Sequence, residues 1–164
     1  MAERRKLTID DISATVAIAA YARDPQALFK AADALVERTI GHKLFTIMRA
    51  HEAIQEVERL YSSNIAAYPV GGRKKKQDTH WGRVVLEEGQ VFVARTPEEV
   101  KQAFADYRLI FSLGIGSIMN VPIGYGGRRL GTMNVSHDAN HFTPADAETG
   151  RVIASLLVPA LLAA

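Results

Sequence analysis

The chain has 164 residues, of which 48% are hydrophobic, and its 20 basic and 18 acidic side chains leave a formal net charge of only +2. This length suits one globular domain with its own core, and so small a charge excess argues against nucleic acid as a partner. The absence of cysteine excludes disulfides, thiolate metal ligands, thiol catalysis and any cofactor attached through sulfur. The charged N-terminus lacks the apolar core of a signal peptide, and no apolar run approaches the ~20 residues of a membrane span. We therefore expect a cytoplasmic protein without membrane association.

The first predicted elements are two helices. Residues 8–22 carry apolar side chains at three- and four-residue steps, which predicts a helix with a single apolar stripe made of Ile9, Ile12, Val16 and Ala19 or Ala20. Asp24 followed by Pro25 combines an N-cap with a proline at the first helical position. A second helix therefore begins there, and we expect it to end at Gly41.

Beyond this helix, apolar side chains recur at every second residue, as they do in strands. Residues 44–49 and 54–61 predict two strands of a hairpin joined by a polar connection. Residues 68–79 are rich in turn formers and contain a run of basic side chains at 73–76, which predicts a long mobile loop. The basic run is either a solvated loop tip or an electrostatic lid over an anionic ligand.

Helical signals return in the middle of the chain. Residues 81–88 predict a short helix stopped by Gly89, and residues 91–94 predict a short strand. Thr96 is followed by a proline and two glutamates, a pattern typical of a capped helix start. We expect that helix to run to about Tyr107.

The most informative segment runs from Ser117 to His137, where two β-rich runs flank a glycine turn. If residues 125–129 form the loop, Val121 lies opposite Met133, and one side of the hairpin becomes wholly apolar, made of Met119, Val121, Ile123, Met133 and Val135. The other side then carries Asn120, Pro122, Thr132, Asn134 and Ser136. This second face is either a solvated sheet surface or the floor of a pocket polar enough to orient a small ligand.

A last helix follows Thr143 and Pro144, which repeat the cap-and-proline pattern, and Pro159 should kink or fray its final turns. The apolar face of this helix is wider than one sheet face requires. Because such a surplus is typical of an interface, we expect a homodimer joined through the terminal helices. We accordingly divide the chain into an N-terminal helix at residues 1–23, which mediates dimerisation, and a main domain at residues 24–164.

Taken in order, these elements resemble a GAF domain. The resemblance rests on S-I-M-N-V-P-I before the glycine turn, L-G-T-M-N-V after it and F-T-P-A-D at the last helix, and it covers roughly Asp24 to Leu162. It implies an α+β fold, similar to GAF and PAS domains, with a central antiparallel sheet of about six strands. The terminal helices would pack on one sheet face, and loops and short helices would enclose a pocket on the other.

Some ligands of the GAF family conflict with this sequence. The Asn-Lys-Phe-Asp-Glu signature of cyclic-nucleotide-binding GAF domains is not present, and without cysteine the chain can neither attach a bilin covalently nor act like the cysteine-dependent GAF reductases of methionine sulfoxide. No serine, histidine and carboxylate grouping indicates catalysis either. We therefore expect no enzyme activity, no catalytic residue and no cofactor.

In a GAF domain, the polar face of this hairpin would line the ligand pocket. The residues that we predict to bind a small molecule are Asn120, Thr132, Asn134 and Ser136 from this face, with Trp81, Tyr107 and Arg108 around it. Trp81 would stack on a planar ligand, and Arg108 offers a forked donor for a carboxylate or phosphate. The structural alternatives are a core anchor for Trp81 and a solvated side chain for Arg108.

The sequence thus predicts a sensory or regulatory GAF domain protein that binds an unidentified small molecule and signals through its dimer and through a separate signalling protein. One alternative is a structural dimerisation module whose own side chains fill the cavity. A further alternative is a metal-binding domain in which two imidazoles, His137 and His141, and a carboxylate such as the intervening Asp138 hold a divalent ion.

Overall fold

The structure, a computed structural model, describes residues 3–75 and 78–164. In this part of the chain six strands form one antiparallel sheet in the order β3-β2-β1-β6-β5-β4. The strands are β1 (Leu44–His51), β2 (Glu56–Ser62), β3 (Arg73–Lys75), β4 (Phe92–Ala94), β5 (Ser117–Tyr125) and β6 (Arg128–His137), and a 3₁₀ turn, η1 (Glu52–Ile54), connects β1 to β2.

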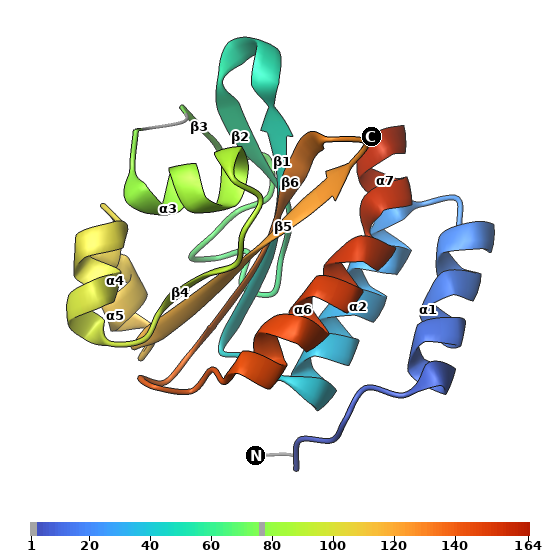
Figure 1. The fold of residues 1–164 in the computed structure, drawn as a ribbon, viewed down its shortest axis with the longest axis horizontal. Coiled ribbons are helices and arrows are strands. Elements are labelled where there is room, and N and C mark those ends of the chain that lie inside the picture. The colour runs from blue at the N-terminus through green and yellow to red at the C-terminus, as the bar shows by residue number, and fades with distance from the viewer. Residues whose placement is uncertain (1–2, 76–77) are drawn as a thin grey trace.

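Helices cover both faces of the sheet (Figure 1). One face carries the terminal helices α1 (Ile9–Tyr21), α2 (Pro25–Thr39), α6 (Pro144–Leu156) and α7 (Val158–Ala163). The other carries the short helices α3 (His80–Gly82), α4 (Pro97–Ala103) and α5 (Tyr107–Ser112) together with the π-helical turn η2 (Arg83–Glu87). The predicted α+β architecture is confirmed. None of the helices in the described ranges is both long and apolar enough to cross a membrane.

The hairpin of β5 and β6 has the predicted register. Val121 pairs with Met133 and Ile123 with Gly131, so the apolar side chains of the hairpin share one face. That face packs under α2 and α6, and its contacts form the main core with fully buried helix side chains such as Phe29, Leu35, Ile153 and Leu157. At Gly131 a Cβ atom would collide with the Met48 carbonyl and with Leu161, so a residue without a side chain is required where β1 and α7 approach β6.

The turn of this hairpin is tighter than predicted. The expected five-residue loop is wrong, because Gly124 and Tyr125 still pair with Arg129 and Arg128 after a register shift that leaves Leu130 of β6 as the extra, unpaired residue. Gly126 and Gly127 alone make the connection, with φ angles of 60° and 78°. Two consecutive residues with positive φ form the two-residue turn that best matches strand twist, and two glycines adopt it without strain.

Part of the basic run forms a strand, where the sequence predicted a loop. Arg73, Lys74 and Lys75 form β3 on the edge of the sheet, opposite Glu58, Val57 and Glu56 of β2. Arg73 lies 3.4 Å from both Glu56 and Glu58, so opposite charges across the strands stabilise a pairing that turn propensity alone does not predict. Lys76, the last residue of the run, lies outside the described residues.

The helix predicted from Thr96 to about Tyr107 is divided in two. Helix α4 ends at Ala103, because Phe104 adopts an extended conformation with φ −124° and ψ 124°. The Phe104 ring then packs 5.7 Å from the Trp81 ring and 6.4 Å from the Phe92 ring. Aromatic packing across the sheet face outweighs one further turn of helix, and α5 begins separately at Tyr107.

Helix α1 buries a different side from the predicted apolar stripe. Ile9 is 77% exposed and Val16 is 48% exposed, whereas Thr15 is buried. Only Ile18 and Ala19 of the helix pack against the main core. The predicted stripe is therefore wrong in part, and much of it lies on the outer surface of the molecule.

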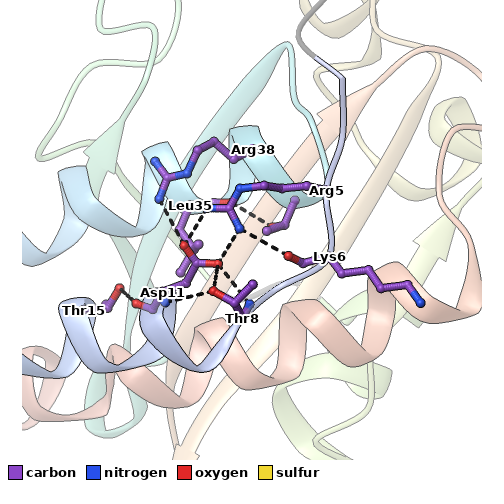
Figure 2. Close-up of polar contacts among 8 residues, drawn as sticks. Arg5, Lys6, Thr8, Asp11, Thr15, Leu35 and Arg38 are labelled. Carbon is purple, nitrogen blue, oxygen red and sulfur yellow. Dashed lines mark hydrogen bonds and ion pairs between the residues drawn. The ribbon is translucent and has the colours of Figure 1, made fainter.

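Polar contacts explain this orientation (Figure 2). Asp11 completes a capping box with Thr8 and accepts two hydrogen bonds of 2.6 Å from Arg5, and its carboxylate also lies 3.8 Å from Arg38 of α2. The Arg5 backbone N–H donates to the Arg38 carbonyl at 3.0 Å. These bonds keep Asp11 turned toward α2, and Thr15, which donates to the Asp11 carbonyl, follows on the same side.

A second capping box lies at the start of α6. Thr143 and Asp146 form it, and Arg4 donates to the Asp146 carboxylate, so Arg4 and Arg5 each contact the capping aspartate of a different helix. At the far end, α6 stops at Leu156 and α7 restarts with Pro159 in its first turn, which confirms the predicted kink.

Candidate functional site

A row of polar side chains crosses the sheet face that lies opposite the main core. Strand pairing aligns Ser62, Thr46, Asn134 and Asn120 on four neighbouring strands, and Phe92 of β4 continues the row. The Asn120 amide donates to Asn134 Oδ1 at 2.7 Å, and the Asn134 amide donates to Thr46 Oγ1 at 3.1 Å. We call this chain of hydrogen bonds from Asn120 through Asn134 to Thr46 the amide ladder.

One atom of the amide ladder has no partner. Asn120 is 4% exposed, and its Oδ1 is buried without a hydrogen bond. A buried carbonyl oxygen left unpaired costs about 1–3 kcal/mol. The amide ladder therefore ends in an acceptor that a donor from a ligand or a water molecule would satisfy.

The other predicted side chains of the hairpin lie beside the amide ladder. Thr132 pairs with Met48 and Pro122 one row away on one side, and Ser136 pairs with Leu44 and Ile118 one row away on the other. Both predicted residues are buried, at 3% and 4% exposure. The predicted polar face is thus brought together as one surface, in which Asn120, Thr132 and Ser136 are buried and Asn134 is partly buried.

Aromatic side chains cover this end of the amide ladder. Phe92 is the direct neighbour of Asn120, and it lies edge-on to the rings of His80, at 5.9 Å, and Phe104, at 6.4 Å. Trp81 is half-buried and packs on Phe104. Trp81 thus packs on another protein side chain, and its role as a cavity wall stays a prediction.

Tyr107 and Arg108 lie farther from the amide ladder. They start α5, where the exposed Arg108 guanidinium stands 5.9 Å from the centroid of the Tyr107 ring, and Lys101 stands 5.4 Å from the same ring. Tyr107 also packs edge-on against Phe111. The structure does not bring this pair into contact with the amide ladder.

Sequence reasoning missed a buried arginine on the same sheet face. Arg59 of β2 is 7% exposed, lies 4.9 Å from the centroid of the Tyr68 ring and donates to the Pro69 carbonyl at 3.2 Å, while its Nε has no partner. Tyr68 in turn donates to Asp106 at 2.7 Å. Burial lowers the pKa of Arg59 and raises the pKa of Tyr68. The burial of Arg59 could have been inferred from the sequence, because strand alternation places this arginine at an inward-facing position.

His137 and His141 form a stacked pair. The rings of His137 and His141 stack with centroids 3.6 Å apart and planes inclined by 4°. His137 Nδ1 accepts the Asp138 backbone N–H at 2.7 Å, and His141 Nε2 donates to the Ile40 carbonyl at 2.7 Å. Within the described ranges no three His, Asp or Glu side chains gather in a way that could hold a metal ion.

Two clefts open at the hairpin end of the sheet. The first has a volume of about 370 Å³ and lies between the β5–β6 turn, Gly89 and α6. The second, about 260 Å³, is bordered by the β1–β2 connection and Leu86 of η2. Arg129 lines both, whereas the side chains of the amide ladder line neither.

Comparisons with known proteins agree with this architecture. The sequence matches the family model of the GAF domain over residues 24–161. A search of the curated proteins gave no match. Among solved structures, the GAF domain of a phosphoenolpyruvate-protein phosphotransferase from Coxiella burnetii superposes with a TM-score of 0.75 at 14% identity, covering 94% of this chain and 92% of that one.

Photoreceptor domains share the fold as well. The phycocyanobilin-bound GAF domain of a cyanobacterial phytochrome gives a TM-score of 0.72 at 15% identity, covering 95% of this chain and 94% of that one. The chromophore-binding domain of a bacteriophytochrome from R. palustris gives 0.69 at 11% identity, and this chain covers 62% of its length. The chain belongs to the GAF domain family, whose members are commonly sensory or ligand-binding.

Proposed function

We propose that this GAF domain is a sensor that binds a planar small molecule over the amide ladder. The observation that carries the proposal is the unpaired Oδ1 of Asn120, a buried acceptor at the end of a chain of hydrogen bonds. Trp81, Phe92 and Phe104 would flank the rings of the ligand, and a donor group on the ligand would complete the amide ladder. The proposed role is binding rather than catalysis, because the amide ladder consists of amides and a hydroxyl.

The structural relatives narrow the mode of attachment. One of them is a GAF domain with phycocyanobilin bound, and the present chain has the same fold but no cysteine. A bond to a cysteine sulfur is impossible here, and we propose that non-covalent contacts hold the ligand. Such a ligand exchanges with its free pool, as a metabolite sensor requires.

A structural role without ligand is the second candidate. It is favoured by the aromatic cover itself, because the rings of Trp81, Phe92 and Phe104 pack on one another beside Asn120. In that case the family fold would serve to hold the terminal helices for association. The two candidates differ in whether the cover moves aside for a ligand.

A second copy of the chain is the partner that we propose for either role. Helix α1 exposes Ile9, Val16 and Tyr21, and α7 exposes Leu162, on the side of the molecule that carries the terminal helices. Burial of these side chains against a second copy would stabilise a dimer. Signals would pass from the sheet through α2 and α6 to this surface and from there to a separate signalling protein.

The ligand proposal is tested by native mass spectrometry of protein purified from its own host, combined with a thermal-shift screen of planar metabolites. A ligand that binds only the folded form raises the melting temperature by linkage. We expect Asn120→Leu to remove this rise, because it deletes the free acceptor. Asn64→Ala is the matched control, since Asn64 accepts the Ala67 N–H in the loop after β2 and takes no part in the amide ladder.

Two results would contradict the sensor. The first is that nothing co-purifies and no compound raises the melting temperature, which would leave the structural module as the better account. The second is an unchanged rise in Asn120→Leu, which would move the binding site away from the amide ladder.

A further inference from the structure

The larger of the two clefts at the hairpin end of the sheet is lined by arginines from two different elements. It lies at the tip of the β5–β6 hairpin, and its walls include Arg129 of β6 and Arg151 of α6 together with Gly89 and Gly124. No aspartate or glutamate belongs to this lining. A positively charged recess of about 370 Å³, which no side chain of the amide ladder lines, therefore remains unassigned.

Arg129 is held in this recess without a counter-charge. Its side chain is half-buried, and its Nε is buried with no hydrogen-bond partner. The guanidinium lies so close to Gly89 that a Cβ atom there would collide with it, and Gly124 lies on its other side. Two glycines thus leave room for a charged group that forms no ion pair within the described part of the chain.

Arg151 supplies the second charge from the opposite wall. Its side chain is 42% exposed, and its Nε lies 3.7 Å from Glu148, a contact that leaves the other guanidinium nitrogens available. Arg129 also borders the second cleft, whose lining includes Glu52 and Glu56, but it pairs with neither. The larger cleft therefore offers guanidinium donors from two elements.

We propose that this cleft binds the phosphate group of a small phosphomonoester. Guanidinium groups bind oxyanions through paired, charge-assisted hydrogen bonds, and two of them match the double charge of a phosphomonoester better than the single charge of a carboxylate. The volume leaves space for a small organic group beside the phosphate.

The test is an NMR titration of the intact protein with inorganic phosphate, compared with chloride at the same ionic strength. We expect saturable shifts of the Gly89 and Gly124 amides and of the Arg129 Nε–H signal. Arg129→Ala and Arg151→Ala should each weaken the binding about tenfold, the effect of losing one charge-assisted hydrogen bond. The same titration with glycerol 3-phosphate should give the same shifts at lower concentration.

Arg128→Ala is the matched control, because Arg128 precedes Arg129 on the exposed hairpin and does not line the cleft. It removes the same charge and should leave the affinity unchanged. Vesicles that contain phosphatidic acid distinguish the source of the phosphate, since binding that depends on Arg129 would identify a lipid headgroup. If Arg129→Ala does not fold, the phosphate affinity of Arg151→Ala is compared with that of Arg128→Ala instead.

Shifts that rise linearly without saturation would overturn the proposal, as would equal losses in Arg128→Ala and Arg151→Ala. The amide ladder does not enter this test. Phosphate binding should persist in Asn120→Leu, so the failure of either proposal can be recognised independently of the other.

Discussion

At the residue scale, Asn134 holds the centre of the amide ladder. Asn134→Leu removes both of its hydrogen bonds and leaves the amide of Asn120 buried without any partner. We expect the free energy of unfolding to fall by about 2 kcal/mol, measured by urea denaturation. The double variant Asn120→Leu/Asn134→Leu should lose less than the sum of the single variants, because both buried partners are removed together. Simple additivity would show that the two amides are not coupled.

His137 makes stability depend on pH. Burial, and then the neighbouring His141, lowers the pKa of His137 below its ordinary value of 6.5; Lys43 acts in the same direction, whereas Asp138 and Glu37 oppose it. The unfolded chain therefore takes up this proton at a higher pH than the folded chain does. The contribution of neutral His137 is fully present above pH 6.5 and is lost progressively below it.

Urea midpoints measured between about pH 7.5 and about pH 5 check this dependence. We expect His137→Gln to have a flatter profile than the natural chain over that interval. His80→Gln replaces an imidazole that packs on Phe92 outside the stacked pair, and it should keep the original slope. Equal slopes in the natural chain and in His137→Gln would refute the assignment.

At the element scale, we expect the polar contacts of Asp11 to contribute more to the docking of α1 than its apolar residues do. Asp11→Asn weakens the contacts with Arg5 and Arg38, so we expect faster amide hydrogen exchange in α1 with little change in the buried strands. Arg5 lowers the pKa of Asp11, so the contact is fully present above the ordinary value of 3.8 and is lost as the pH falls below it.

Asp10→Asn is the control for α1, because Asp10 lies in the same first turn but outside the capping box. It removes the same charge and should leave the exchange rates of α1 nearly unchanged. High salt should partly reproduce the effect of Asp11→Asn, since exposed ion pairs are screened. Similar exchange in both variants would assign the docking of α1 to its apolar contacts.

Most elements could be predicted because their signals are local. The caps at Asp24, Thr96 and Thr143 each mark a helix start that the structure contains, and the alternation of β5 and β6 fixed their register. The exceptions depend on contacts distant in sequence. Strand β3 needs the acidic edge of β2, and the break at Phe104 needs the rings of the opposite segment.

The candidate site was harder to predict than the fold, because its properties depend on contacts between residues that are distant in sequence. Alternation placed Asn120 and Asn134 on one face, but it could not show that Asn120 would lack a partner. Arg59 and Arg129 are ordinary strand residues in the sequence. Their burial depends on Gly72 and Gly89, glycines from other segments that leave room for the guanidinium groups.

At the scale of the whole molecule, the exposed apolar residues of α1 predict self-association. We expect sedimentation velocity at tens of micromolar to show a dimer, and Val16→Glu to shift it to monomer by placing a charge in the interface. Ile54→Glu is the matched control, because Ile54 is 56% exposed on the β1–β2 connection, away from α1. A natural chain that stays monomeric over this concentration range would end the dimer proposal.

The adjacent arginines near the N-terminus connect the starts of α1 and α6. Arg4 is anchored on Asp146 at the start of α6, and Arg5 on Asp11 at the start of α1. A force on α1 is therefore transmitted through the backbone of Arg4 and Arg5 to the beginning of α6, without passing through the sheet. We therefore expect a displacement of α1 relative to α6 to strain both arginine contacts.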